Sequence, residues 1–303
     1  MISDTAKRLG ATTVTPPTAV PWHQRRFARK VGGMGLTYAI ALAGAVLLMI
    51  PIAFMVSTSL KTKGQVFSSP PVWFPAEPQW RNYPEALTVK PFGLYFLNTL
   101  QIVIPAVVGS VVSSTMVAYA FARLRFPGRD VLFIIVLSTL MLPMEVQLIP
   151  VFMIFKELGW LNSFKPMQVW GFFGNPFYIF LMRQFFMSIP RDIEDAARID
   201  GCGPVSLLTR IFIPMAGPAV VSVALFSFMA WWNEFLAPLL YLDSPDKFPL
   251  SLGLASFLGD PMRGTDWHLL MAAALVTVLP CILVYFLAQK YFIQGVVVSG
   301  VKG

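Results

Sequence analysis

Two acidic residues, Glu145 and Glu234, lie within long apolar stretches of the sequence, where ionised side chains are rare. Gln147 follows the first acid by two positions, and Trp231, Trp232 and Asn233 directly precede the second. Because burying an ionised carboxylate in hydrocarbon is costly, each acid should face other protein groups or a watery cavity. The two acids therefore make either hydrogen bonds between helices or part of a path for a polar solute.

The groups around Glu234 suit a ligand that carries many hydroxyl groups. Carboxylates and amides form hydrogen bonds with hydroxyl groups, and indole rings offer flat apolar surfaces for a sugar ring. Packing or interhelical hydrogen bonds also explain such residues, and a Trp near a span end is an ordinary interfacial anchor. As the sharper alternative, the sequence predicts a solute path lined by Glu145, Gln147, Trp231, Trp232, Asn233 and Glu234.

The sequence shows no recognised pattern for catalysis or metal binding. It contains no phosphate-binding loop that ends in Gly-Lys-Ser or Gly-Lys-Thr, and no Ser/His/Asp arrangement. The histidines His23 and His268 are far apart, and Cys202 and Cys281 are isolated from each other. We therefore expect a chain that is not an enzyme by itself and that holds neither a cofactor nor a metal.

A polar segment at residues 190–214 separates two long apolar stretches. A short charged helix in this place cannot cross a bilayer, so it should lie outside the membrane. Two pairs, Arg191 with Asp195 and Glu194 with Arg198, are spaced to form ion pairs along such a helix. The segment is therefore either an amphipathic link on the membrane surface or a surface that a partner protein binds.

One face of this short helix carries little side-chain bulk. Ile193, Ala196 and Ala197 share that face, and two adjacent alanines allow the groove of a partner to come close. Gly201 ends the helix, and Pro214 stops a second short helix that follows it. The thin face favours a docking role.

Composition and apolar patterning indicate an integral membrane protein. Of the 303 residues, 56 % are hydrophobic and only 13 % are charged, and the mean hydropathy is +0.67. A soluble domain of this size needs more surface charge, whereas apolar blocks of about 20 residues are typical of membrane-spanning helices. The pattern predicts an all-α fold with six transmembrane helices, at about residues 31–60, 91–122, 131–155, 167–186, 211–242 and 267–289.

The distribution of Arg and Lys predicts the orientation of these spans. Six spans put both termini on one side, and the connections on that side carry nearly twice as many Arg and Lys residues as the others. Both termini and the polar segment are therefore expected in the cytoplasm. The net charge of +8 follows this topology and does not indicate nucleic acid. The expected organisation is a cytoplasmic tail at 1–30, a first span at 31–60, an extracytoplasmic loop at 61–90, a core at 91–289 and a cytoplasmic tail at 290–303.

The polar segment resembles a known signature. The spacing Asp195-Ala196-Ala197, three residues, Gly201, nine residues, Ile211, one residue and Ile213-Pro214 is similar to the loop of binding-protein-dependent ABC import permeases. That family has Glu in place of Asp195 and Leu in place of Ile213. The resemblance implies a coupling loop at about 188–213, whose helix docks in a cleft of an ATPase. It assigns this coupling to Glu194, Asp195, Ala196, Ala197, Arg198, Asp200, Gly201, Ile211 and Pro214.

Further motifs are similar to the carbohydrate-uptake branch of that family, which includes the smaller permease subunit of the maltose transporter. These motifs are Phe96–Leu100, Leu158–Asn162, Trp232–Phe235 and the stretch from Gln289 to Gly303. The resemblance implies a sugar or sugar-like solute and a place in the cytoplasmic (inner) membrane. The implied partners are a second homologous permease, two ATPase subunits that bind ATP and Mg²⁺, and an extracytoplasmic solute-binding protein.

Two other classes of function remain open from the residues alone. An ion- or proton-coupled carrier would use Glu145 and Glu234 as proton sites, although the lack of internal repeats and the polar segment argue against it. An intramembrane enzyme would need the same two acids at a fixed distance, which nothing in the sequence provides. Disaccharides, oligosaccharides and glycerol phosphates all remain open as the solute.

Overall fold

The computed structural model is helical throughout its described part and contains no β-strand there. It describes residues 22–259 and 264–300, with side chains at 36–143, 146–259 and 264–291. The predicted all-α fold is therefore confirmed. Residues 1–21 and 301–303 of the two predicted tails lie outside the described residues. The chain divides into two compact units, Met1–Phe54 and Met55–Gly303.

The first unit contains most of helix α1, which extends from Trp22 to Ser59. The side chains of residues 36–54 are exposed or half-buried and mostly apolar, as with Leu48 at 76 % exposure. A helix that is apolar all round fits a bilayer rather than water. The segment Leu36–Ser59 is long and apolar enough to cross a membrane. Because α1 begins at Trp22, the helix reaches into the tail predicted at 1–30.

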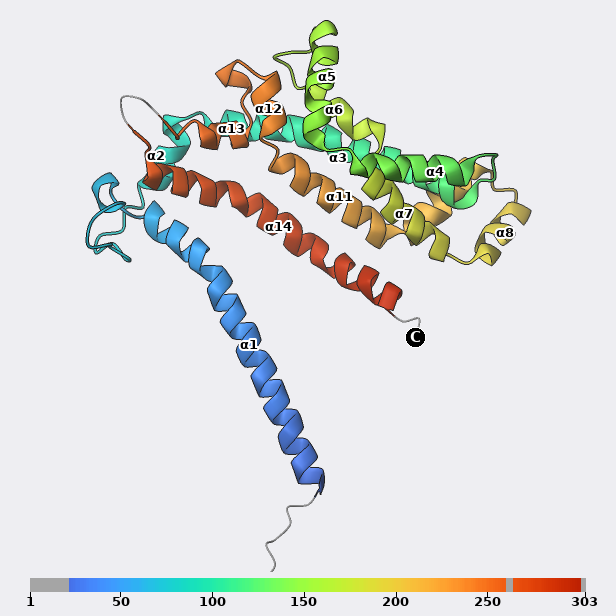
Figure 1. The fold of residues 1–303 in the computed structure, drawn as a ribbon, viewed down its shortest axis with the longest axis horizontal. Coiled ribbons are helices and arrows are strands. Elements are labelled where there is room, and N and C mark those ends of the chain that lie inside the picture. Colours follow the sequence, from blue (N-terminus) through green and yellow to red (C-terminus); the bar gives the residue numbers. More distant parts are fainter. Residues whose placement is uncertain (1–21, 260–263, 301–303) are drawn as a thin grey trace, which may run out of the picture. The chain divides into compact units, whose positions relative to one another are not determined.

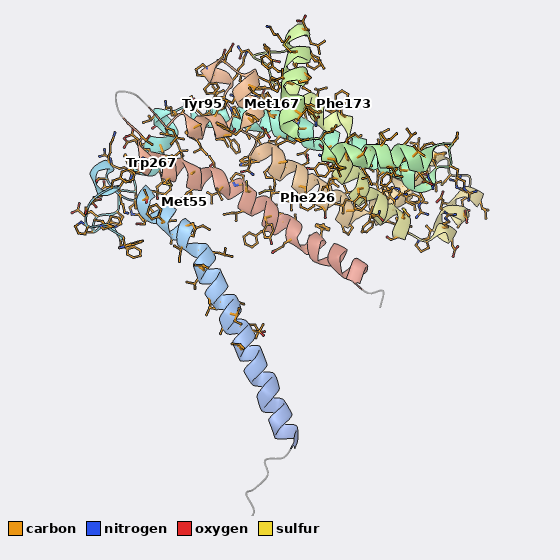
Figure 2. All side chains as sticks on the ribbon, viewed as in Figure 1. Met55, Tyr95, Met167, Phe173, Phe226 and Trp267 are labelled. Atoms are coloured by element: carbon orange, nitrogen blue, oxygen red, sulfur yellow. The ribbon has the colours of Figure 1, made fainter. Side chains whose placement is uncertain are left out.

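The second unit is a set of long and short helices (Figure 1). They are α2 (Asn82–Val89), α3 (Phe92–Arg123), α4 (Arg129–Ser138), α5 (Met144–Glu157), α6 (Lys165–Trp170), α7 (Pro176–Ser188), α8 (Arg191–Ile199), α9 (Pro204–Leu207), α10 (Ile213–Met215), α11 (Gly217–Trp232), α12 (Leu236–Tyr241), α13 (Leu250–Ala255) and α14 (Trp267–Gly300). Short 3-10 or π turns are η1 (Lys63–Gln65), η2 (Thr139–Met141), η3 (Gly171–Phe173), η4 (Leu208–Phe212) and η5 (Pro245–Lys247). Helix α3 packs against α7 and α11, and α11 packs against α14. Tyr95 and Met167 are buried, whereas Phe173 is exposed (Figure 2).

The described helices are more interrupted than the six continuous spans predicted from the sequence. Three segments are long and apolar enough to cross a membrane alone, namely Leu36–Ser59, Phe92–Arg123 and Trp267–Tyr291. Two further pairs, Arg129–Met141 with Val146–Glu157 and Pro204–Met215 with Gly217–Trp232, qualify only together and bend by more than 40° between their members. If each bent pair is one span, the described residues contain five, so the count of six is not reproduced.

Proline and glycine account for these interruptions. Pro143 has extended backbone before α5, and Gly174, with φ of +76°, separates η3 from α7. The break at Gly174 divides the predicted span at 167–186, which leaves α7 with 13 residues. Pro218 lies in the first turn of α11, where the missing N–H costs little. Proline and glycine therefore interrupt the helices even where the apolar pattern of the sequence is continuous.

A close backbone approach holds the divided fourth segment against α3. A Cβ atom at Gly171 would lie 2.2 Å from the backbone oxygen of Ala106, so only glycine fits. Ser113 Oγ donates a hydrogen bond to the backbone oxygen of Gly171 at 3.0 Å, and Gln168 Nε2 donates to Gln101 O at 2.8 Å. These contacts fix the start of α7 beside α3.

Candidate coupling loop and solute pocket

The coupling loop begins with α8, whose end is capped by backbone hydrogen bonds. Gly201 N donates to Arg198 O at 3.0 Å, and Cys202 N donates to Ala197 O at 2.9 Å. These two bonds form a Schellman motif, which requires a left-handed residue just beyond the helix. Gly201 supplies it with φ of +84°. The predicted end of the helix at Gly201 is therefore confirmed.

The side chains of α8 lie on two different sides of the helix. Glu194 and Ala197 are buried, whereas Asp195, Ala196 and Ile199 are exposed, with Ile199 at 87 %. Ala197 belongs to a hydrophobic core formed by α3, α7 and the second half of the coupling loop. The two alanines predicted to share one docking face are therefore divided, because one of them packs inward. A partner that binds α8 would contact the exposed set.

One of the two ion pairs predicted along α8 is present. Glu194 Oε1 accepts hydrogen bonds from Arg198 Nη2 at 2.7 Å and from Arg198 Nε at 3.2 Å. This hydrogen bonding raises the pKa of Arg198 above its ordinary value, so its side chain stays cationic. Within the described part of the chain, Arg191 and Asp195 are exposed and form no ion pair with each other. Such an exposed pair would contribute little stability in any case.

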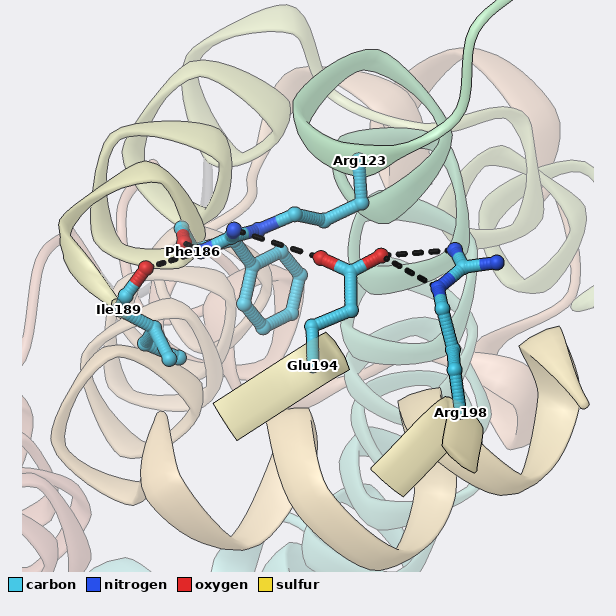
Figure 3. A network of polar contacts seen from close by, with 5 residues as sticks. All are labelled: Arg123, Phe186, Ile189, Glu194 and Arg198. Atoms are coloured by element: carbon cyan, nitrogen blue, oxygen red, sulfur yellow. Dashed lines mark hydrogen bonds and ion pairs between the residues drawn. The ribbon is translucent and has the colours of Figure 1, made fainter. Parts of the chain in front are cut away.

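Arg123, the last residue of α3, joins α8 to α7 in a network that was not predicted (Figure 3). Its Nη1 lies 3.4 Å from Glu194 Oε2, and its Nη2 donates to Ile189 O at 2.5 Å and also to Phe186 O. The side chains of Arg123 and Glu194 are only 4 % and 9 % exposed. Glu194, which the resemblance assigns to the ATPase contact, therefore lies against its own chain and not on the exposed side of α8.

Phe212 anchors the second half of the coupling loop. It is fully buried, and its ring centroid lies 5.2 Å from that of Tyr119 and 5.6 Å from that of Phe186. The guanidinium carbon of Arg123 lies 4.8 Å from the same ring. Phe212 occupies the unspecified position of the signature, next to Ile211, so the motif gave no signal for it. Aromatic packing therefore holds a loop whose first half carries most of the charges.

The other coupling residues predicted in this region are at the surface or partly buried. Ile211 is half-buried and packs against the same hydrophobic core as Ala197. Pro214 is exposed and lies in the first turn of α10. Asp200 is exposed at the C-cap of α8. The structure thus brings the predicted coupling residues together in one loop while giving them different surroundings.

A pocket of about 410 Å³ lies among α3, α5, α6, α7, α11 and α12. Three of the six residues predicted for the solute path line it, namely Gln147, Trp231 and Glu234. The full lining is Ser110, Gln147, Leu148, Val151, Trp170, Phe173, Gly174, Asn175, Pro176, Tyr178, Ala230, Trp231, Glu234, Leu236, Ala237, Leu240 and Tyr241. Aromatic walls with a few polar groups are typical of small-molecule sites.

Glu234 lies at the break between α11 and α12, where its carboxylate meets the backbone. Its Oε1 accepts a hydrogen bond from Ala237 N at 2.9 Å, and its backbone oxygen accepts one from Ser251 Oγ at 2.7 Å. A carboxylate has about four acceptor positions, so this bond leaves capacity for the hydroxyl groups of a ligand. The half-buried carboxylate is therefore positioned by its own helix start and can still bind a solute.

The remaining predicted path residues are placed differently. Trp232 is buried, donates from Nε1 to Thr277 O at 3.2 Å, and stacks on Phe228 at 5.1 Å. Asn233 is exposed and donates from Nδ2 to Met229 O at 2.8 Å, which caps the end of α11. Neither residue lines the pocket, because consecutive residues at a helix end point in different directions. The side chain of Glu145 lies outside the described residues.

Several residues of the pocket lining were not predicted from the sequence. Trp170, Asn175 and Tyr178 come from the region where η3 meets α7. Asn175 Oδ1 accepts hydrogen bonds from Phe177 N at 2.9 Å and from Tyr178 N, so it caps α7. Asn before Pro is a readable helix-start signal, but nothing in the sequence places that start beside α11. Among the described residues, no group of three or more His, Cys, Asp and Glu side chains is placed to hold a metal ion.

Comparisons with known proteins agree with this architecture. The chain is 34 % identical over 270 residues to the diacetylchitobiose uptake system permease protein NgcG of Streptomyces coelicolor, which covers 88 % of this chain and 86 % of that relative. It is 35 % identical over 263 residues to the osmoprotective compounds uptake permease protein GgtD of Synechocystis sp., covering 84 % and 87 %. A chain in the crystal structure of a bacterial ABC transporter that imports alginate matches with a TM-score of 0.74 and 27 % identity, covering 92 % of this chain and 100 % of that one.

The family of binding-protein-dependent transport system inner membrane components matches residues 110–298. This range covers more than half of the chain and includes the whole coupling loop. The match favours import driven by an ABC transporter over an ion- or proton-coupled carrier. The chain therefore belongs to the family of binding-protein-dependent transport system inner membrane components, and it is a membrane-embedded permease subunit of an ABC importer rather than an enzyme.

Proposed function

We propose that this permease subunit moves a sugar or sugar-like solute across the cytoplasmic membrane. The observation that carries this proposal is the pocket in which Gln147, Trp231 and Glu234 meet. It combines hydrogen-bonding groups with aromatic walls in a volume suited to a small ligand. The relative NgcG is a permease of a diacetylchitobiose uptake system, and the similar solved transporter is involved in the import of alginate, which supports the same solute class.

ATP hydrolysis belongs to partner subunits in this proposal. Two ATPase subunits hold ATP and Mg²⁺, and one of them binds the exposed face of α8 at Asp195, Ala196 and Ile199. A second homologous permease completes the membrane path, and an extracytoplasmic binding protein delivers the solute. The excess of Arg and Lys on one side supports cytoplasmic positions for α8 and both termini.

The solute class is tested with the assembled transporter reconstituted in lipid vesicles. We expect uptake of a labelled disaccharide or oligosaccharide that depends on ATP, and mass spectrometry of the purified complex should identify the bound solute. Glu234→Gln should weaken the apparent solute affinity about tenfold, which corresponds to about 1.4 kcal/mol. Glu157→Gln, a change at an exposed acid outside the pocket lining, is the matched control. Uptake of glycerol phosphate without sugar uptake would contradict the proposed class.

The docking role of α8 is tested separately. Ala196→Trp places a bulky ring on the exposed face, so the ATPase groove should no longer fit, and uptake should fall while the subunit still inserts. The control is Val205→Trp, because Val205 is 75 % exposed but lies outside α8. Uptake and ATP hydrolysis are measured in the same vesicles. Normal uptake by the Ala196→Trp transporter would count against docking at this face.

A further inference from the structure

Arg123 connects three helices through one side chain. It belongs to α3, donates hydrogen bonds to Phe186 O and Ile189 O at the end of α7, and pairs with Glu194 on α8 (Figure 3). A guanidinium can do this because its planar fork presents several N–H donors in fixed directions. Any displacement of α8 that moves Glu194 therefore acts on α3 and on the end of α7 at the same point.

Helices α3 and α7 both extend from this network to the solute pocket. Ser110 on α3 and Tyr178 on α7 line that pocket. At 1.5 Å rise per residue, Ser110 lies about 20 Å from Arg123 along α3, and Tyr178 lies about 12 Å from Phe186 along α7. The network thus lies at the ends of α3 and α7, and the pocket lies at the middle of α3 and the start of α7.

The surroundings of the network leave Arg123 and Glu194 little freedom to adjust. Both side chains are almost fully buried, and the ring of Phe212 lies against the guanidinium. Arg198 holds the second carboxylate oxygen of Glu194 at 2.7 Å. On another side the pair borders a hollow of about 460 Å³, so these contacts, and not close packing all round, fix its position. A pair held on all these sides should move together with the elements it joins.

We propose that Arg123 and Glu194 are positioning residues that transmit the movement of α8 to α3 and α7 and thereby change access to the pocket. This inference rests on the proposed function, in which an ATPase moves α8 and a solute occupies the pocket. The exposed face of α8 receives the force, and the buried face passes it on. Arg123, which lies outside the coupling loop, thus becomes part of the coupling machinery.

Two conservative variants of the assembled transporter test the transmission. Glu194→Gln keeps the size of the side chain but removes its charge, and Arg123→Lys keeps the charge but replaces the planar fork by one ammonium group. We expect solute uptake per ATP hydrolysed to fall about tenfold in each variant, while ATP hydrolysis itself persists. Arg125→Gln is the matched control, because this neighbouring arginine is exposed and forms no ion pair in the described part of the chain.

A cross-link then tests whether uptake requires the connection between α3 and α8 or only the charges of Arg123 and Glu194. Cysteines are introduced by R123C and E194C in a background that carries C202S and C281S, since the native thiols are free. A hollow of about 460 Å³ is lined by both positions, so a short bis-methanethiosulfonate reagent can reach them. We expect the uncoupled cysteine variant to regain uptake per ATP when the two positions are joined, and to lose it again on reduction.

Three outcomes would overturn the inference, and a fourth would instead concern the proposed function. Wild-type uptake per ATP in both conservative variants would overturn the inference, and so would a cross-link that forms without restoring uptake. If Glu194→Gln prevents assembly of the transporter, the pair serves folding alone, which also overturns it. Failure of the proposed function would appear differently, as absence of ATP-dependent sugar uptake in the unaltered complex.

Discussion

The coupling loop and the solute pocket differ in how their residues are distributed along the chain. The coupling loop is one continuous stretch, whereas the pocket lining extends from Ser110 to Tyr241 and draws on six helices. A continuous stretch keeps its spacing visible in the sequence. The residues of a pocket that forms only on folding are scattered along the chain, so they appear in the sequence as isolated polar residues. The proposed coupling loop is therefore easier to recognise from sequence than the proposed solute pocket.

The two regions also treat their carboxylates differently. Glu194 is enclosed by Arg123 on one side and Arg198 on the other. Glu234 accepts a hydrogen bond from the backbone N–H of Ala237 and faces a pocket. A charge held by two guanidinium groups suits a mechanical role, and one with spare acceptor positions suits ligand binding. The predictions below test this contrast.

Removing the aromatic anchor of the coupling loop should have the largest effect. Phe212→Ala deletes a fully buried ring that packs on Tyr119 and Phe186, so the free energy of unfolding should fall by about 3–5 kcal/mol. Chemical unfolding of the purified protein measures the loss. Phe235→Ala, at a ring that is 42 % exposed near the pocket region, is the control and should change stability by about 0.5 kcal/mol. Equal losses of unfolding free energy in the two variants would show that the ring of Phe212 does not anchor the loop more strongly than an exposed ring.

Changing the glycine that ends α8 should have a smaller, local effect. Gly201→Ala forces a side chain into the left-handed region, at a cost of about 1–2 kcal/mol. Hydrogen exchange of the Gly201 and Cys202 amides should accelerate, since both close the cap. Gly203→Ala is the matched control, because Gly203 has φ of −75° and open space around its Cα. Similar exchange in both variants would show that backbone conformation is not the reason for glycine.

Two adjacent tryptophans should separate binding from stability. Trp231→Ala removes a wall of the pocket and should weaken solute affinity about tenfold. Because the half-buried ring also packs on two hydrophobic cores, this variant should lose stability too. Trp232→Phe removes the hydrogen bond to Thr277 O and should lower stability by about 1 kcal/mol with unchanged affinity. Solute binding and unfolding are measured on the same preparations. An affinity loss in the second variant alone would mean that the pocket is wrongly placed.

The sequence predicted the features that depend on neighbouring residues. The end of α8 at Gly201 could be predicted because a helix stop has a local chemical cause. Glu234, Gln147 and Trp231 stood out because polar groups are rare in apolar blocks. The division of the predicted span at 167–186 was missed, although Gly174 and Pro176 carry a local signal for it.

The features that depend on tertiary packing could not be predicted in the same way. Basic residues are expected at the cytoplasmic ends of spans, so nothing in the sequence indicated that Arg123 pairs with Glu194. Ala197 looked equivalent to Ala196 until the fold showed which side of α8 is buried. Tyr178 gave no signal, because its place in the pocket depends on how α7 packs against α3 and α11.

The smallest expected effect concerns the acid that differs from the family signature. Asp195 is exposed on α8, so Asp195→Glu should leave the stability of the isolated permease unchanged. The longer side chain reaches further toward a bound ATPase. We therefore expect the affinity of the permease for the ATPase to rise about twofold, a change in free energy within the range of a surface ion pair. Titration of ATPase subunits onto the purified permease pair measures this change. Asp192→Glu, at another exposed acid of the same helix, should not alter the affinity. A gain with both variants would point to net charge at α8, whereas a loss with Asp195→Glu would show that the shorter acid is matched to its own partner.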